Sequence, residues 1–144
     1  MISSEKTKLF PILFVDDDPL AHKLIESSFK DWKVFYAFSA EDALKLLEKE
    51  NIQIVISDIN MPGMSGIQFL EVIKKRYGTI QVIMITAEDE IENLINALSM
   101  GANDFLIKPV NKTQLEDALM NTVDKISRWK VAMKDLFNKA RNKD

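Results

Sequence analysis

The chain has 144 residues, of which 47% are hydrophobic, and its 22 acidic and 19 basic residues give a formal net charge of -3. This length and apolar content suffice for one domain with a single core. The near balance of charge gives no reason to expect nucleic acid or an anionic membrane as a direct partner. The absence of cysteine excludes disulfides, thiolate catalysis and Cys-based zinc sites, and it fits a reducing cytoplasm.

The first residues do not predict a targeting segment. Residues 1–8 are polar and mixed in charge, and the apolar run 9–15 is too short for a signal core and ends in three aspartates. No window approaches the roughly 20 consecutive apolar residues that a membrane span requires. We therefore expect a cytoplasmic protein without an export signal or a membrane partner.

Five short apolar runs, rich in Val, Ile and Phe, predict β-strands, and each is followed by a polar loop. The predicted strands cover residues 12–15, 34–37, 54–57, 82–85 and 105–107. Several of them carry apolar residues at consecutive positions instead of alternating ones. This pattern favours parallel strands that helices cover on both faces.

Segments of helical periodicity alternate with these strands. The predicted helices cover residues 20–30, 40–49, 66–77 and 90–100, with a final one from about 112. Ser39 is the expected N-cap of the second helix. Because crossovers between parallel strands are right-handed, five strands alternating with five helices predict a doubly wound α/β fold with a five-stranded parallel sheet. In such sheets the functional site lies beyond the carboxyl ends of the strands.

The last predicted helix is long for a compact domain, because residues 112–140 would span about 43 Å at about 1.5 Å per residue. Its later part carries apolar residues at spacings of three and four, which resemble a heptad seam. These residues are Ile126, Trp129, Met133, Leu136 and Ala140. We expect an N-terminal tail (1–10), one domain (11–125) and a helical extension (126–144). The extension could pack back on its domain, serve as a linker or form a coiled coil.

Acidic side chains follow two of the predicted strands. Asp16, Asp17 and Asp18 come after the first strand, and Asp58 comes after the third. Such a cluster of carboxylates is unfavourable unless a cation neutralises it. Oxygen ligands without Cys favour a hard metal such as Mg²⁺.

A hydroxyl and an ammonium group are expected at the same edge of the sheet, because Thr86 ends the fourth strand and Lys108 follows the fifth. Carboxylates with a divalent metal, a hydroxyl and a fixed positive charge around one more carboxylate suit phosphoryl transfer, in which charge neutralisation does most of the catalysis. An aspartate can be the nucleophile and form an acyl phosphate.

In order and spacing, these landmarks resemble the receiver domain family of two-component response regulators over about residues 11–125. The matching segments are Asp16-Asp17, Ser57-Asp58-Ile59-Asn60-Met61-Pro62, Thr86-Ala87 and Phe105-Leu106-Ile107-Lys108-Pro109. The resemblance implies the strand order 2-1-3-4-5. It also implies a phosphoacceptor that takes its phosphoryl group from a sensor histidine kinase or a phosphotransfer protein, and not a metabolic enzyme.

The resemblance assigns a role to each matching residue. Asp58 would accept the phosphoryl group. Asp17 would bind Mg²⁺ directly and Asp16 through water, while Asp58 and the backbone carbonyl of Asn60 would complete the protein ligands. Asp18 matches no ligand of the family.

Three further residues would respond to the phosphoryl group. Thr86 would hydrogen-bond a phosphoryl oxygen, Lys108 would pair with it, and Phe105 would turn inward as the switch aromatic. The affected surface would be the fourth helix, fifth strand and fifth helix. Lys108-Pro109 would carry a cis peptide bond. Asn60 and Glu88 occupy the positions that tune the lifetime of the phosphate in the family.

Other interpretations remain open at this point. The three aspartates could form a solvated turn that caps the first helix, with Pro19 at the first helical position. Asp16-x-Asp18 also superficially suits an aspartyl phosphohydrolase. The chain could act as a constitutive homodimer through its last helix, or lead into an output domain. His22, the single histidine, is expected to be neither a phosphohistidine nor a metal ligand.

Overall fold

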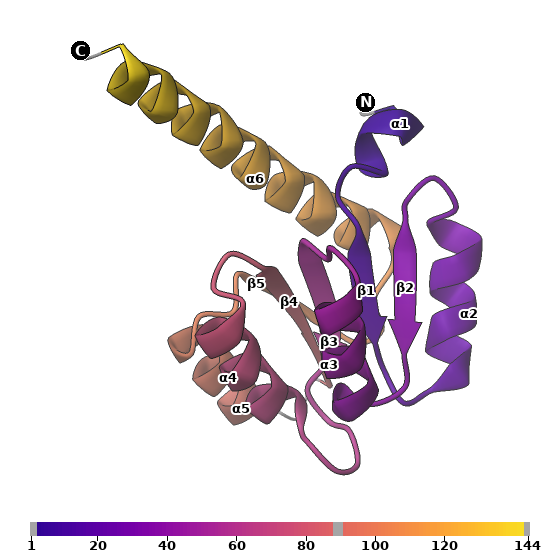
Figure 1. Cartoon of the computed structure of the whole chain (residues 1–144). Helices are drawn as coiled ribbons and strands as arrows, with labels where there is room; N and C mark the ends of the chain where they lie inside the picture. The colour runs from indigo at the N-terminus through magenta and orange to yellow at the C-terminus, as the bar shows by residue number, and fades with distance from the viewer. Residues whose placement is uncertain (1–2, 88–90, 143–144) are drawn as a thin grey trace.

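The computed structural model describes residues 3–87 and 91–142 and contains one five-stranded parallel sheet in the order β2-β1-β3-β4-β5. The strands are β1 (Ile12–Val15), β2 (Val34–Ala37), β3 (Ile54–Asp58), β4 (Gln81–Thr86) and β5 (Asp104–Ile107). Helices cover both faces of the sheet (Figure 1). The predicted doubly wound fold and its strand order are therefore confirmed.

Six helices occur in the described residues, one more than predicted. They are α1 (Ser4–Thr7), α2 (Pro19–Ser28), α3 (Ala40–Lys49), α4 (Gly66–Arg76), α5 (Ile91–Ser99) and α6 (Lys112–Arg141). The additional helix α1 is a single turn at the N-terminus, too short for any periodicity to predict it. The predicted start of the fourth helix, Glu90, lies outside the described residues, as does Glu88.

The apolar residues of the strands form two cores, one on each face of the sheet. On one face, side chains such as Leu13, Val55 and Met84 pack against α3, α4 and α5. On the other face, Ile12, Ile56 and their neighbours pack against α2 and the first half of α6. Because successive side chains of a strand point to opposite faces, burial on both sides requires apolar residues at consecutive positions. Every residue of β1, β3 and β4 is buried.

Side-chain caps fix the starts of four helices next to the ends of the strands. The capping residues are Asp18 for α2, Ser39 for α3, Ser65 for α4 and Asn111 for α6, and each accepts a hydrogen bond from a backbone amide in the first turn. At α4 the Gln68 side chain also accepts from the Ser65 amide, which completes a capping box. Ser39 is thus confirmed as an N-cap.

Two strands extend beyond their predicted carboxyl ends, and both extensions place a predicted site residue inside the sheet. β3 includes Asp58 and β4 includes Thr86, because Asp58 pairs with Ile85 and Thr86 pairs with Ile107 in the parallel register. The last residue of each strand is therefore fixed by hydrogen bonding of the backbone.

The last helix is continuous over 30 residues, and its two parts have different surroundings. Its buried residues end at Ile126, and every described residue from Arg128 onward is exposed. Figure 1 shows this second part leaving the body of the domain beyond the amino ends of the strands. The first part of α6 is thus a component of the core, whereas the second part is a projecting helix.

The N-terminal segment lies beside the base of this projecting helix. Phe10 is buried in the same core as Ile126, and the ammonium of Lys130 lies 5.0 Å from the centre of the Phe10 ring. The Thr7 hydroxyl donates to the backbone carbonyl of Asp31. No helix in the described part of the chain is long and apolar enough to cross a membrane.

Candidate functional site

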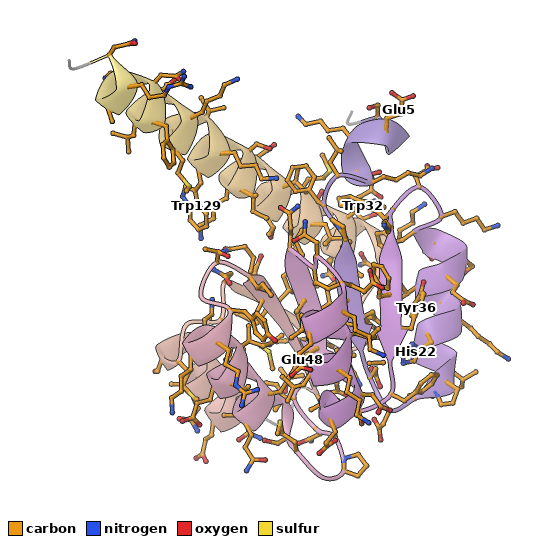
Figure 2. The ribbon with its side chains drawn as sticks, viewed as in Figure 1. Glu5, His22, Trp32, Tyr36, Glu48 and Trp129 are labelled. Atoms are coloured by element: carbon orange, nitrogen blue, oxygen red, sulfur yellow. The ribbon has the colours of Figure 1, made fainter. Side chains whose placement is uncertain are left out.

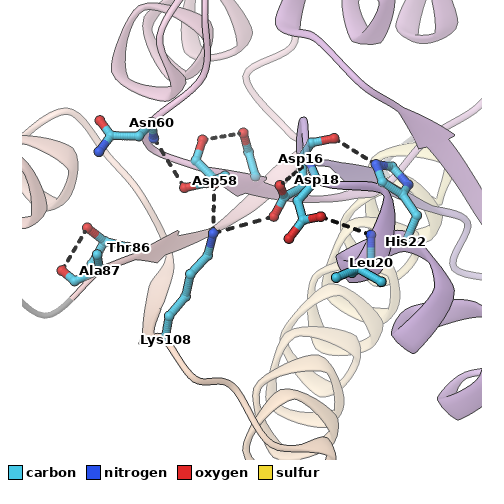
Figure 3. A network of polar contacts seen from close by, with 10 residues as sticks. Asp16, Asp18, Leu20, His22, Asp58, Asn60, Thr86, Ala87 and Lys108 are labelled. Atoms are coloured by element: carbon cyan, nitrogen blue, oxygen red, sulfur yellow. Dashed lines mark hydrogen bonds and ion pairs between the residues drawn. The ribbon is translucent and has the colours of Figure 1, made fainter.

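Four strands place polar side chains at the carboxyl edge of the sheet. Asp16 follows β1, Asp58 ends β3, Thr86 ends β4 and Lys108 follows β5. β1 and β3 are neighbours in register, so the residues that follow Val15 and Ser57 lie side by side. Figure 3 shows Lys108 reaching across this edge to both carboxylates.

Asp58 is only 6% exposed, and both of its carboxylate oxygens are held. Oδ1 accepts a hydrogen bond of 3.1 Å from the backbone amide of Asn60, and Oδ2 accepts one of 2.8 Å from Nζ of Lys108. The carboxylate therefore has a fixed direction at the sheet edge. A fixed carboxylate with a cation beside it is suited to act as a nucleophile towards a charged phosphoryl group.

A glycine lets helix α4 approach the backbone of Asp58. The amide of Gly66 donates to the carbonyl of Ile59 at 2.8 Å, and a Cβ atom on Gly66 would lie 2.2 Å from the carbonyl oxygen of Asp58. No Cβ fits at that distance from a backbone oxygen. The close approach of the first turn of α4 therefore depends on glycine at this position.

Asp16 and Asp17 bring two further carboxylates to Asp58. One oxygen from each of the three aspartates lies within 4.8 Å of the other two. Asp16 is 2% exposed, and its Oδ1 accepts a 2.9 Å hydrogen bond from the Asp18 amide. Burial raises the pKa of the Asp16 carboxyl above its ordinary value, although the hydrogen bond from Asp18 opposes this effect.

Lys108 is the cation that partly balances this cluster. Its Nζ lies 2.8 Å from Asp58 Oδ2 and 3.6 Å from Asp16 Oδ2. Burial by itself would lower the pKa of this ammonium group, but the hydrogen bond and the charge of Asp58, followed by the charge of Asp16, raise the pKa overall. The peptide bond Lys108-Pro109 is cis, as predicted.

The charges and ligand atoms of the cluster fit a hard divalent cation. Three carboxylates against one ammonium leave two negative charges uncompensated, and all the carboxylate donors are oxygen atoms. Oxygen donors at a negatively charged site are what Mg²⁺ prefers. Asp16, Asp17 and Asp58 are thus brought together as the sequence predicts.

Thr86 lies at the same sheet edge as this cluster without joining it, and Phe105 lies further back on the neighbouring strand β5, where it pairs with Met84. Thr86 is buried at the end of β4, and its hydroxyl donates to the carbonyl of Ala87 at 3.3 Å. Figure 3 shows the Thr86 side chain at the same edge as Asp58 and Lys108. Phe105 is half-buried on β5.

Asp18 has a structural role. It is the N-cap of α2, its Oδ1 accepts from the Leu20 amide at 3.0 Å, and Pro19 occupies the first turn of that helix. The helix-cap interpretation is therefore correct for this one aspartate of the three. Asp18 does not contribute to the carboxylate cluster formed by the described residues, which weakens the comparison with an Asp-x-Asp phosphohydrolase.

Two residues next to the site have no assigned role from the sequence. Nε2 of His22 lies 2.7 Å from the backbone oxygen of Asp16. Glu41, on α3, accepts a 2.8 Å hydrogen bond from the Met64 amide, and this bond lowers the pKa of the Glu41 carboxyl. The first contact spans six residues and the second 23, and neither corresponds to a known local motif.

The contact of Glu41 fixes the loop between β3 and α4. Gly63 in this loop has a φ of 77°, a left-handed conformation that favours glycine. A Cβ on Gly63 would also lie 2.9 Å from Oε1 of Glu41. The loop that contains Asn60 is therefore held at its middle by α3 and at its end by the capping box of α4.

The family model of the response regulator receiver domain matches residues 12–120. The response regulator protein FleR of Pseudomonas aeruginosa is 39% identical over 108 residues, which are 74% of this chain and 23% of FleR. An NtrX-like response regulator of Rickettsia felis is 36% identical over 129 residues, covering 85% of this chain and 27% of that protein. The chain thus spans about a quarter of the length of these curated relatives.

Solved structures agree with these sequence matches. A receiver domain protein from Clostridium thermocellum superposes with a TM-score of 0.79 at 29% identity and covers 83% of this chain and 98% of its own. A CheY-like receiver domain from Methanospirillum hungatei gives 0.78 at 29% identity, with coverage of 83% and 97%. The matched family model, the shared fold and the acidic edge of the sheet agree. The chain belongs to the response regulator receiver domain family.

Proposed function

We propose that this receiver domain accepts a phosphoryl group on Asp58 in a reaction that requires Mg²⁺, and that the phosphorylated form presents a changed surface to a protein partner. The phosphoryl donor is a sensor histidine kinase or a phosphotransfer protein. The observation that carries this proposal is the group of three carboxylates within 4.8 Å, with the ammonium of Lys108 at 2.8 Å from Asp58.

The proposed transfer forms one bond and breaks one bond. A carboxylate oxygen of Asp58 attacks the phosphorus of a phosphohistidine, the P–N bond breaks, and its electron pair remains on the imidazole nitrogen. The product is an aspartyl phosphate. With acetyl phosphate as donor, a P–O bond breaks and acetate leaves. Lys108 neutralises charge on the phosphoryl oxygens, which is the main requirement of such transfers.

Asp16, Asp17, Asp58 and the backbone carbonyl of Asn60 are the proposed protein ligands of Mg²⁺. When bound, the ion supplies positive charge to the phosphoryl oxygens. Asp16 and Asp58 are buried at fixed positions, so their carboxylates need little rearrangement to bind a cation. The backbone amide of Asn60 donates to Asp58 Oδ1. This bond keeps the backbone of Asn60, whose carbonyl is the proposed ligand, close to the Asp58 carboxylate.

We propose Thr86 and Phe105 as the residues that report phosphorylation to the surface. The 3.3 Å hydrogen bond from the Thr86 hydroxyl to Ala87 is long, so a phosphoryl oxygen is a stronger acceptor for the same hydroxyl. Movement of Thr86 towards Asp58 would change the space around Phe105. The hydrogen bond between the Thr86 hydroxyl and a phosphoryl oxygen exists only in the phosphorylated state. It therefore supplies the differential free energy that a switch needs.

A groove beside Lys108 is the proposed place where the phosphoryl donor docks. A cavity of about 500 Å³ lies between α2 and the loop into α6, and its lining includes Asp16, Lys108 and Leu24. Leu20 and Leu24 on α2 are 67% and 66% exposed. Exposed apolar side chains beside a reactive group suit a protein partner that buries them on binding.

The proposed organisation assigns residues 11–125 to the receiver domain and residues 126–144 to a helical extension in a cytoplasmic protein. The extension is a linker or a dimerisation seam, and as a linker it would lead into an output domain. A relative from Proteus hauseri, 38% identical over 97 residues, is described as the DNA-binding transcriptional regulator NtrC. For this chain the output remains a proposal.

The test is mass spectrometry of the intact protein after incubation with acetyl phosphate and Mg²⁺. We expect one phosphate adduct on the wild type, none on Asp58→Asn, and none after chelation of Mg²⁺. Asp18→Asn is the matched control, because Asp18 is an aspartate outside the cluster, and this variant should be phosphorylated like the wild type. An adduct that survives Asp58→Asn but disappears in Asp16→Asn would instead support the phosphohydrolase interpretation.

A further inference from the structure

The one histidine of the chain is enclosed by aromatic rings next to the carboxylate cluster. His22 lies on α2 and is 6% exposed. Its ring is stacked on Phe38 at 4.0 Å between centroids, and it also contacts Phe14 at 5.1 Å and Tyr36 at 5.5 Å. Figure 2 shows His22 and Tyr36 together between α2 and β2. These contacts from β1, β2 and the residue after β2 hold the ring in one orientation.

The ring orientation directs one nitrogen at the backbone of the site. Nε2 of His22 lies 2.7 Å from the carbonyl oxygen of Asp16 (Figure 3). A carbonyl oxygen only accepts hydrogen bonds, so Nε2 must carry the proton and donate. The other nitrogen, Nδ1, is buried without a hydrogen-bond partner among the described residues. The structure thus gives the ring one polar contact, and that contact is to Asp16.

The accepting carbonyl belongs to the peptide unit that joins Asp16 to Asp17. β1 ends at Val15, so this carbonyl lies past the strand pairing. The plane of a peptide unit fixes the directions of both Cα atoms that it connects. A donor that holds this carbonyl therefore limits the directions in which the Asp16 and Asp17 carboxylates can point.

We propose that His22 is a positioning residue for the metal site. Its hydrogen bond to the Asp16 carbonyl fixes the Asp16–Asp17 peptide, so that both carboxylates face Asp58 before a cation binds. This inference rests on the proposed Mg²⁺ site. It goes beyond that site in assigning to a residue of α2, which contributes no ligand, part of the affinity for the ion.

The turn formed by residues 16–18 is held by a second hydrogen bond besides the one from His22, and the two bonds fix different parts of it. The Asp18 amide donates to Oδ1 of Asp16, a bond between neighbours within the turn itself. The bond from His22 ties the turn to α2 and, through the aromatic contacts, to β2. Without it, the Asp16–Asp17 peptide could rotate while the local bond to Asp18 remained. Loss of such outer contacts typically costs about 10- to 100-fold in metal affinity.

The test compares three substitutions by the dissociation constant for Mg²⁺, measured by isothermal titration calorimetry on the full chain. His22→Gln keeps a donor at about the distance of Nε2. His22→Met has a similar length without a donor, and His22→Phe keeps the aromatic ring without a donor. We expect the Gln variant to bind Mg²⁺ within about threefold of the wild type, and the Met and Phe variants to bind about tenfold more weakly or worse.

Circular dichroism and thermal unfolding identify any variant that does not fold, and the Gln and Met pair suffices if the Phe variant fails. Backbone amide shifts of Asp17 in the metal-free protein should move in Met and Phe and return in Gln. If Met or Phe binds Mg²⁺ like the wild type, or Phe binds better than Gln, the ring serves packing only and the inference is wrong. If the wild type binds no Mg²⁺, the metal site itself is overturned, a separately recognisable result.

Discussion

The carboxyl edge of the sheet and the projecting part of α6 both break the rule that charges lie outside and apolar side chains lie inside. At the sheet edge, Asp16 and Asp58 are buried as carboxylates. On α6, the side chains of Met133, Leu136 and Phe137 are 58%, 66% and 68% exposed. The first departure is partly compensated within the chain, because Lys108 lies next to both carboxylates. No comparable compensation covers the α6 side chains in the described structure.

This difference in compensation separates two functions of the molecule. The sheet edge serves chemistry within the domain, whereas the projecting helix requires a partner surface. Buried like charges persist in a fold only if a function or a bound cation requires them, because they reduce stability in the metal-free state. Exposed apolar side chains along one helix suit contact with another surface, which the chain does not provide. We therefore expect substitutions at the sheet edge to change stability and chemistry together. Substitutions on the projecting helix should change neither in the isolated monomer.

The largest expected effect at the sheet edge is that of Gly66→Ala. The added Cβ would lie 2.2 Å from the Asp58 carbonyl oxygen, so either α4 or the end of β3 must shift. We expect the free energy of unfolding to fall by about 3 kcal/mol or more, the upper part of the range for overpacking, and phosphorylation to slow. Urea denaturation and the acetyl phosphate assay measure the two effects.

Gly78→Ala is the matched control for this substitution. A Cβ on Gly78 would have its nearest neighbour at 3.7 Å, an ordinary contact. This variant should stay within about 0.5 kcal/mol of the wild type, as substitutions away from special features do. Equal losses at the two glycines would show that the close approach of α4 to Asp58 is not what Gly66 provides.

The second prediction compares two apolar residues of α6. Ile126 is 6% exposed and Leu136 is 66% exposed. Ile126→Ala should lower the free energy of unfolding by about 2–3 kcal/mol, because it removes core packing. Leu136→Ala should change it by less than about 0.5 kcal/mol in dilute monomer. Thermal or urea unfolding at low protein concentration, with sedimentation to establish the oligomeric state, measures the difference.

A large loss of unfolding free energy in Leu136→Ala would contradict the expected difference between Ile126 and Leu136. It would mean that the projecting part of α6 is covered in solution. If that loss appeared only at high protein concentration, the cover would be a second copy of the chain. A loss independent of concentration would mean that the helix folds back on its own domain. The first result supports the dimerisation seam, and the second excludes it.

The sequence predicts the sheet and the primary site well because both depend on residues that are close in the chain. Consecutive apolar residues in runs such as Val82–Ile85 indicate buried parallel strands, and polar residues directly after those runs must meet at one edge. Asp58 and Lys108 are found in this way, before any resemblance is used. Their positions at the carboxyl edge follow from the parallel topology, whereas the strand order that brings them together comes from the resemblance to the receiver domain family.

The sequence does not predict the contacts that depend on packing between separate elements. His22 faces Asp16 because aromatic rings of β1 and β2 enclose it, and nothing around residue 22 indicates which neighbours it has. Glu41 reaches Met64 from another helix, 23 positions away. The helix α1 is too short to show a period. In each case the information lies in side-chain packing, not in a local pattern.

The smallest expected effect, and the one that tests the buried charge directly, is that of Asp16→Asn. Burial raises the pKa of Asp16 in the folded state above its value in the unfolded chain, so ionisation of this carboxyl opposes folding. Replacing it with a neutral side chain should raise the melting temperature of the metal-free protein at pH 7. An increase of about 3–5 °C corresponds to roughly 1 kcal/mol in a domain of this size.

The stability difference between Asp16→Asn and wild type should depend on pH and on Mg²⁺. This dependence distinguishes the removal of a buried charge from a general improvement in packing. Below the unfolded-state pKa the Asp16 carboxyl is neutral in both states, so the penalty is absent; the penalty grows between the unfolded-state pKa and the raised folded-state pKa and is complete above the latter. The stability difference between Asp16→Asn and wild type should therefore vanish at acidic pH and be full at pH 7. Mg²⁺ should stabilise the wild type more than the variant and narrow the difference, because the ion binds the folded state through this carboxylate. A difference that is independent of both pH and Mg²⁺ would mean that the Asp16 carboxylate carries no cost of buried charge, and the contrast between the sheet edge and the projecting helix would then rest on Asp58 alone.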